Sequence, residues 1–130
     1  MGLRISSCVI ALIQRAAAEA APLEACGLLF GSDGVERASV AANVADDPAR
    51  RFEIDPAALI AALKAERAGG ERVIGYWHSH PSGDATPSAT DAAMAAADGK
   101  IWVIVAGEAL TAWRAGASGL HGRFERVELT

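Results

Sequence analysis

The chain has 130 residues, with 12 Lys and Arg against 16 Asp and Glu, a formal net charge of −4 and 52% hydrophobic residues. This length fits one domain over residues 1–130, and the mixture of charged and hydrophobic residues excludes a disordered chain. Apolar runs fall short of the roughly 20 residues of a transmembrane helix, and the mild acidity disfavours a nucleic-acid binder, so neither a membrane nor a nucleic acid is expected as a partner.

Apolar spacing predicts a first helix that starts near Ser6 or Ser7 and ends before Pro22. Its predicted buried face consists of Val9, Leu12, Ile13, Ala16, Ala17 and Ala20. A short apolar strand is expected over residues 27–30. A turn over residues 31–34 then leads into a second strand that runs through Val40.

An acidic cap followed by proline, Asp55-Pro56, predicts the start of a second helix. The residues expected on its buried side are Leu59, Ile60 and Leu63, and two glycines at 69–70 should end it. A third helix is expected over residues 88–97, before Gly99. The predicted helices therefore alternate with the strands.

Residues 73–77 and 101–105 are apolar on both faces of a strand, which is typical of strands covered on both sides. Two more strands are expected around residues 110–113 and 124–129. Strands that alternate with three helices indicate an α/β fold, a single domain with a mixed β-sheet between helices.

The most informative pattern is a pair of histidines, His78 and His80, at the end of a predicted buried strand. Residues two apart on a strand point to the same face, and Cα atoms roughly 6.5–7 Å apart allow two imidazoles to converge on one metal ion. Asp91 falls in the first turn of the next helix, and the intervening loop can fold it back as a third ligand. Two imidazoles and one carboxylate leave a fourth position for water, which is typical of catalytic zinc.

Other interpretations of these residues remain open. Ser88 and Asp91 also match a helix capping box, which is compatible with ligation because a helix start fixes the direction of the carboxylate. Asp84 is interpreted as a solvated turn residue, and His121 as a non-catalytic histidine. Other enzymes that use paired histidines fit less well, since an amidohydrolase-type barrel needs about 250 residues and nucleobase deaminases need a Pro-Cys-x-x-Cys segment.

The segment His-Ser-His-Pro at 78–81, followed after six residues by Ser-Ala-Thr-Asp at 88–91, resembles the signature of the JAMM (MPN+, Mov34/PAD-1) metallopeptidases. The upstream half of that pattern, a glutamate before a Cys-Gly-Leu-Leu strand start, resembles Glu24 and residues 26–29. The resemblance implies a fold similar to that of cytidine deaminases and one zinc ion per chain. It also implies roles for five residues: zinc ligation by His78, His80 and Asp91, general acid/base catalysis by Glu24, and polarisation of the scissile carbonyl by the hydroxyl of Ser88.

The two cysteines, Cys8 and Cys26, are too few for a disulfide framework, and a reduced, cytoplasmic setting is expected. Cys26 adjoins an apolar strand. We expect it to pack in the core rather than act as a nucleophile, because no histidine beyond the metal pair is evident to activate it.

Small stand-alone bacterial members of the family act on ubiquitin-like sulfur-carrier proteins, and a chain of this length has little room for the segments that grip ubiquitin chains. The resemblance therefore implies a zinc-dependent (iso)peptidase that cleaves after the C-terminal Gly-Gly of such a carrier. Gly75, Tyr76 and Trp77, with residues 27–31, are expected to form edges that pair with the extended substrate. A general or cell-wall/phage-tail type peptidase acting on short peptides, and a non-catalytic scaffold, remain alternatives.

Overall fold

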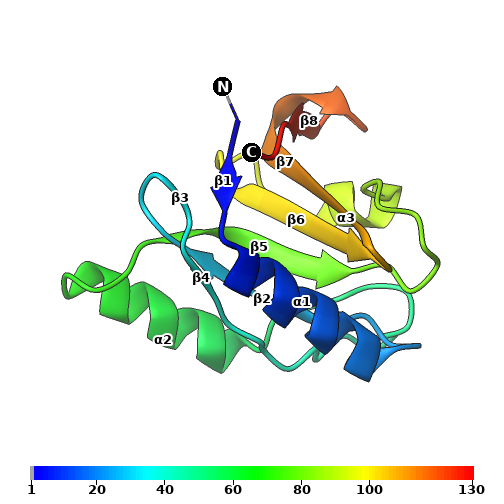
Figure 1. Cartoon of the computed structure of the whole chain (residues 1–130), viewed down its shortest axis with the longest axis horizontal. Helices are drawn as coiled ribbons and strands as arrows, with labels where there is room; N and C mark the ends of the chain where they lie inside the picture. Colours follow the sequence, from blue (N-terminus) through cyan, green and yellow to red (C-terminus); the bar gives the residue numbers. More distant parts are fainter. Residues whose placement is uncertain (1) are drawn as a thin grey trace.

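A six-stranded mixed sheet lies at the centre of the computed structural model, which describes residues 2–130 (Figure 1). The elements in chain order are β1 (Arg4–Ile5), α1 (Ser7–Ala20), β2 (Cys26–Phe30), β3 (Gly34–Val35), β4 (Arg37–Ala38), α2 (Pro56–Arg67), β5 (Val73–Ser79), α3 (Ala89–Met94), β6 (Ile101–Ala106), β7 (Ala109–Leu120) and β8 (Phe124–Val127). The sheet order is β4-β2-β5-β6-β7-β8, and β1 pairs separately with β3. The expected α/β fold with a mixed sheet between helices is confirmed.

The parallel direction of β5 and β6 brings the carboxyl ends of these two strands together at the middle of the sheet. Strands β5 and β6 are parallel, whereas the other neighbouring pairs in the sheet are antiparallel. The connection from β5 to β6 contains α3, so this helix begins at the carboxyl end of the central strand pair. In open α/β sheets this is the edge at which ligands bind.

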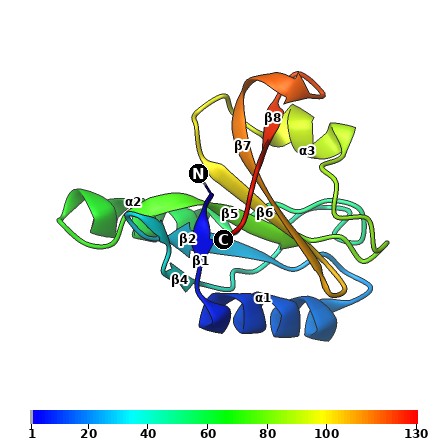
Figure 2. The same cartoon turned by 45° about the horizontal axis from the view of Figure 1, so that its top comes forward.

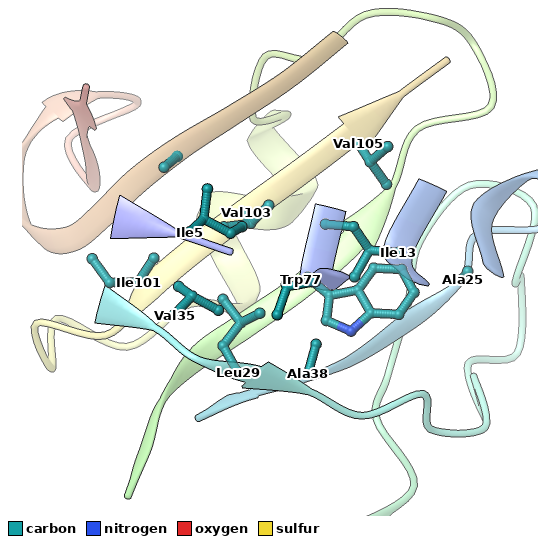
Figure 3. Close-up of a cluster of buried hydrophobic side chains, with 12 residues drawn as sticks. Ile5, Ile13, Ala25, Leu29, Val35, Ala38, Trp77, Ile101, Val103 and Val105 are labelled. Atoms are coloured by element: carbon teal, nitrogen blue, oxygen red, sulfur yellow. The ribbon is translucent and has the colours of Figure 1, made fainter. Parts of the chain in front are cut away.

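The two faces of the sheet carry separate cores. Helix α1 covers one face, where Ile13, Leu29, Trp77 and Val103 are almost fully buried (Figures 2 and 3). The other face carries an aromatic cluster against which α2 and α3 place partly buried residues; its large aromatic members are Phe30, Phe52, Trp102, Trp113 and Phe124. Among residues 2–130, no helix has the length and apolar character needed to cross a bilayer.

Helix boundaries follow the predicted capping residues at the N-termini. The side chain of Ser6 accepts a hydrogen bond from the Val9 N–H, and that of Asp55 accepts one from the Ala57 N–H. Helix α3, however, ends at Met94 rather than at residue 97. The backbone turns extended at Ala95, whose side chain is buried in the aromatic core, so packing overrides the helix propensity of the alanines that follow.

Several predicted buried positions are exposed. In α1 only Val9 and Ile13 are buried, and Leu12 is 39% exposed. In α2 no residue is buried and Ile60 is 52% exposed, since Leu59 and Ala62 are the residues of this helix that pack against the aromatic core. Similarly, the expected strand through residue 40 is two short strands, β3 and β4. The short β1 was not predicted, since two residues give no periodic pattern.

Gly27 leaves the space for a hydrogen bond that crosses β2. The indole N–H of Trp77 donates to the Ser39 carbonyl at 2.8 Å, and a Cβ at position 27 would collide with both of these groups. The bond satisfies an indole whose residue has no exposed surface. A glycine at this position is therefore required for packing.

We predict that Gly27→Ala lowers the free energy of unfolding by about 1–3 kcal/mol, because the added methyl group overpacks the core at this point. Gly116→Ala is the matched control, since a Cβ at that strand position meets no atom within 4 Å. Urea unfolding of both variants measures the difference. Equal stability of the two variants would contradict this account.

Candidate metal centre and active site

Three side chains converge at the carboxyl end of β5. His78 is the penultimate residue of this strand, and the His80 N–H continues the pairing by donating to the Val105 carbonyl at 2.9 Å. The two Nε2 atoms lie 2.9 Å apart. The Asp91 carboxylate, from the first turn of α3, lies 3.2 Å from the Nε2 of His78 and 3.1 Å from that of His80. The structure thus brings together the three residues predicted as metal ligands.

Asp91 is oriented by a reciprocal capping box with Ser88. The Ser88 N–H donates to Asp91 Oδ2 at 2.9 Å, and the Asp91 N–H donates to Ser88 Oγ at 3.0 Å. Burial opposes ionisation of Asp91, but hydrogen bonds from both histidines hold the pKa of this carboxyl well below its usual range. Asp91 is therefore a buried anion, only 2% exposed. Ser88 caps the helix as predicted, and this capping is compatible with the convergence of Asp91 and the two histidines.

The two imidazoles are held in different ways. His80 Nδ1 lies 2.7 Å from the Asp84 carbonyl oxygen, so Nδ1 carries a proton and Nε2 is the nitrogen that faces the cluster. His78 is fully buried and stacked on Phe52, with ring centroids 4.3 Å apart. Burial lowers the pKa of His78, which favours the neutral imidazole that a metal requires.

The donor set of this cluster fits a metal ion. One ligand atom each from His78, His80 and Asp91 lies within 4.8 Å of the others. Two imidazole nitrogens and one carboxylate oxygen are ligands that zinc accepts, and a carbonyl acceptor behind His80 is the usual support for a ligating histidine. The cluster can therefore hold one metal ion and leave a coordination position open.

Glu24 lies two residues before the adjacent strand β2, near His80. The β2–β5 register pairs Cys26 with His78, and the contacts between Ala25 and Ser79 extend it by one residue: the Ser79 N–H donates to the Ala25 carbonyl, and the Ala25 N–H donates to Ser79 Oγ. One further step places Glu24 opposite His80.

The environment of Glu24 raises the pKa of its carboxyl group towards neutral pH. The side chain is 6% exposed, and its Oε1 has no hydrogen-bond partner. Burial raises the pKa of Glu24 to about 7, His80 opposes this shift and Asp91 adds to it. A carboxyl group that titrates near neutral pH can both accept and donate a proton.

Three further residues support the site. Asn43 Nδ2 donates to the Glu24 carbonyl at 2.9 Å, the Ser79 hydroxyl accepts the hydrogen bond from Ala25 described above, and Asp84 contributes the carbonyl that faces His80. Asp84 keeps an exposed side chain that accepts from the Thr86 N–H, as expected of a turn residue. Contacts with backbone groups produce no recognisable pattern of side chains in the sequence. Of these three residues, only Ser79 has a position, between the two histidines, that indicates a role.

Cys26 is a packing residue beside the site. It is fully buried, and its Sγ lies 3.7 Å and 3.8 Å from the carbonyl oxygens of Ala41 and Ala42. Burial raises the pKa of the Cys26 thiol to about 12, which leaves it protonated at neutral pH. This agrees with the expectation that Cys26 is not a nucleophile.

The prediction that two strand segments form free sheet edges for the substrate is wrong. Residues Gly75, Tyr76 and Trp77 lie in β5, which is hydrogen-bonded to β2 on one side and to β6 on the other. Residues 27–30 lie in β2, which is likewise flanked by β4 and β5. Both segments therefore lie inside the sheet and not at its edge. Of the three β5 residues, Tyr76 lines an apolar hollow on the aromatic face, whereas Trp77 is buried under α1.

The fold and the site define a JAMM-type domain. The family described as prokaryotic homologs of the JAB domain (Prok-JAB) matches residues 6–116, and the chain belongs to this family. Two solved structures share the fold: a protein from Desulfitobacterium hafniense (TM-score 0.83, 27% identity, 98% of this chain and 91% of that one) and a JAB1/MPN domain protein from Archaeoglobus fulgidus (TM-score 0.63, 23% identity, 99% and 98%).

Two curated proteins are similar in sequence. One is named desampylase, from Haloferax volcanii, and is 36% identical over 86 residues, which are 64% of this chain and 62% of that protein. The other is named probable TtuB-protein conjugate cleaving protease, from Thermus thermophilus, and is 42% identical over 71 residues, 55% of this chain and 48% of that protein. The matches span about half to three fifths of the length of these relatives.

We predict that Glu24→Gln stabilises the metal-free protein relative to the wild type, increasingly as the pH rises. A carboxyl group with a raised pKa stabilises the fold when protonated, below its ordinary value of 4.5, and this contribution is lost as the pH rises through about 7. The difference between the two pKa values corresponds to about 3 kcal/mol in the free energy of unfolding. Urea unfolding in chelator at about pH 5 and pH 8 measures this difference, and a pH-independent difference would contradict it.

Proposed function

We propose that this chain is a zinc-dependent isopeptidase that hydrolyses the amide bond after the C-terminal Gly-Gly of a ubiquitin-like sulfur-carrier protein. The observation that carries the proposal is the buried Glu24 carboxyl, with a pKa near 7, beside a cluster of two histidines and one aspartate. The names of the two curated relatives support a protein conjugate as the substrate. Two free cysteines support a reducing, cytoplasmic setting.

The residues of the chain divide the work of amide hydrolysis. His78, His80 and Asp91 would hold zinc, which when bound supplies a Lewis acid and a water molecule with a pKa near 7. Glu24 takes the proton from the attacking water and delivers it to the leaving amine, since its pKa near neutrality allows both transfers.

Ser88 supplies a further donor. Its Oγ accepts from the Asp91 N–H, so the hydroxyl proton is free to point away from the helix. In this mechanism that proton stabilises the oxyanion that forms on the scissile carbonyl. The capping contact then serves catalysis as well, because it fixes the position of the Ser88 oxygen.

An apolar hollow next to the metal cluster supports a role in binding the substrate tail. The hollow has a volume of about 340 Å³, and Phe52, Tyr76, Met94 and Trp102 are among its lining residues. Its Phe52 wall stacks on His78, so one aromatic ring separates the hollow from the first predicted ligand. A diglycine end suits this arrangement, because glycine lets the substrate backbone approach the metal closely.

We predict that one pair of variants separates metal binding from chemistry. His80→Ala should lose both stoichiometric zinc and activity. Glu24→Gln should keep zinc but lose about 10²–10⁴-fold in kcat, the usual contribution of a general acid/base. Elemental analysis gives the zinc content, and cleavage assays give the rate. Stoichiometric zinc in a folded His80→Ala protein would overturn the ligand assignment.

We predict that cleavage requires the terminal glycines of the carrier. Sulfur carriers with a peptide extension after Gly-Gly are incubated with the protein, and intact mass reports release of the extension. Carriers in which either glycine is replaced by leucine should resist cleavage. Equal rates on both sets would favour a general peptidase of short peptides, and no cleavage of any carrier or peptide would favour a non-catalytic scaffold.

A further inference from the structure

The loop of residues 81–88 connects the second and third predicted ligands but contains no regular secondary structure. Its residues 81–84 and Thr86 are exposed, whereas Pro87 is buried. The His80–Asp84 contact holds the first half of the loop, and the capping box ties Ser88 to Asp91. Contacts from elsewhere in the fold hold the second half of the loop, which leads directly into Ser88.

Two such contacts come from the C-terminal β7–β8 hairpin, which lies on the same side of the molecule as α3 (Figure 2). The Thr111 hydroxyl donates to the Ala85 carbonyl, with 2.6 Å between the two oxygens. The same hydroxyl oxygen accepts from the indole N–H of Trp113 at 2.9 Å, which directs its own proton towards Ala85.

The second contact is made by His121, in the turn between β7 and β8. Its Nε2 lies 3.1 Å from the Pro87 carbonyl oxygen, and because a carbonyl only accepts, the imidazole is the donor. His121 has a φ of 54°, a left-handed conformation that is uncommon outside glycine, and Gly119 at the end of β7 and Gly122 in the turn also have positive φ. This turn lies beyond the family match, which ends at residue 116.

We infer that Thr111 and His121 are positioning residues, which hold the carbonyls of Ala85 and Pro87 so that Ser88 and Asp91 are placed for metal binding and oxyanion stabilisation. They act through the loop and do not touch the metal cluster. The consequence for catalysis rests on the proposed function, whereas the consequence for metal binding does not require a substrate.

Matched variants separate the hydrogen bonds from general packing. His121→Ala removes the donor, and His121→Gln restores one, since the glutamine amide nitrogen and imidazole Nε2 are equally many bonds from Cα. Both replacements experience the same left-handed backbone. Thr111→Val removes the hydroxyl at nearly constant volume, and Thr111→Ser retains it.

Two measurements decide the inference without a substrate. Zinc affinity, measured by chelator competition, should fall about 10-fold in His121→Ala and Thr111→Val, at the lower end of the range for residues that support a metal ligand. Amide hydrogen exchange of Ser88 and Asp91 in the metal-free protein should accelerate about 10-fold in the same variants, because the capping box opens more often. His121→Gln and Thr111→Ser should recover most of both values.

The inference is overturned if His121→Ala and Thr111→Val keep wild-type zinc affinity and exchange rates. It is also overturned if the Gln and Ser variants lose as much as the Ala and Val variants, since the effect then comes from packing alone. If the wild type binds zinc and the variants behave as expected but no carrier is cleaved, the proposed function fails while the positioning role stands. With a cleavable carrier, His121→Ala should lower kcat more than it raises KM.

Discussion

The arrangement of the site depends on one carboxylate, that of Asp91. Its Oδ2 accepts from the Ser88 backbone N–H and lies close to the Nε2 atoms of both His78 and His80. A buried anion is stable only when its oxygens are satisfied, so the helix start and the histidine pair each supply partners that the other alone would not provide. Removing any one of these groups leaves a charge in the interior without full compensation.

The sheet topology explains why these groups meet. Parallel strands need a crossover, and the crossover from β5 to β6 contains α3. The carboxyl end of β5 therefore faces the first turn of a helix, which places the two histidines opposite the capping box. Antiparallel pairing of β2 with β5 then places Glu24 across from His80, so a residue far away in the chain reaches the same end of the sheet.

Local patterns were sufficient to predict the metal cluster, since His78, His80 and Asp91 lie within 14 residues and follow strand and helix geometry. Glu24 depended on the family resemblance, because the strand register that brings it near His80 is not visible in its own segment. The substrate edges failed for a related reason: apolar glycine-containing strands do not reveal which neighbours flank them. Asn43, Thr111 and His121 were missed because their acceptors are backbone carbonyls, which leave no pattern of side chains.

Helix α3 has only six residues, far fewer than an isolated helix needs to persist in water. Its stability must come from its surroundings, and the group that caps its first turn is also the one that faces the imidazoles. Ordering of this helix and metal binding by the three side chains would thus be thermodynamically linked. The affinity for a metal ion would then depend on the folding equilibrium of this one turn as well as on the ligand atoms, so sequence changes that strengthen or weaken the turn would change that affinity.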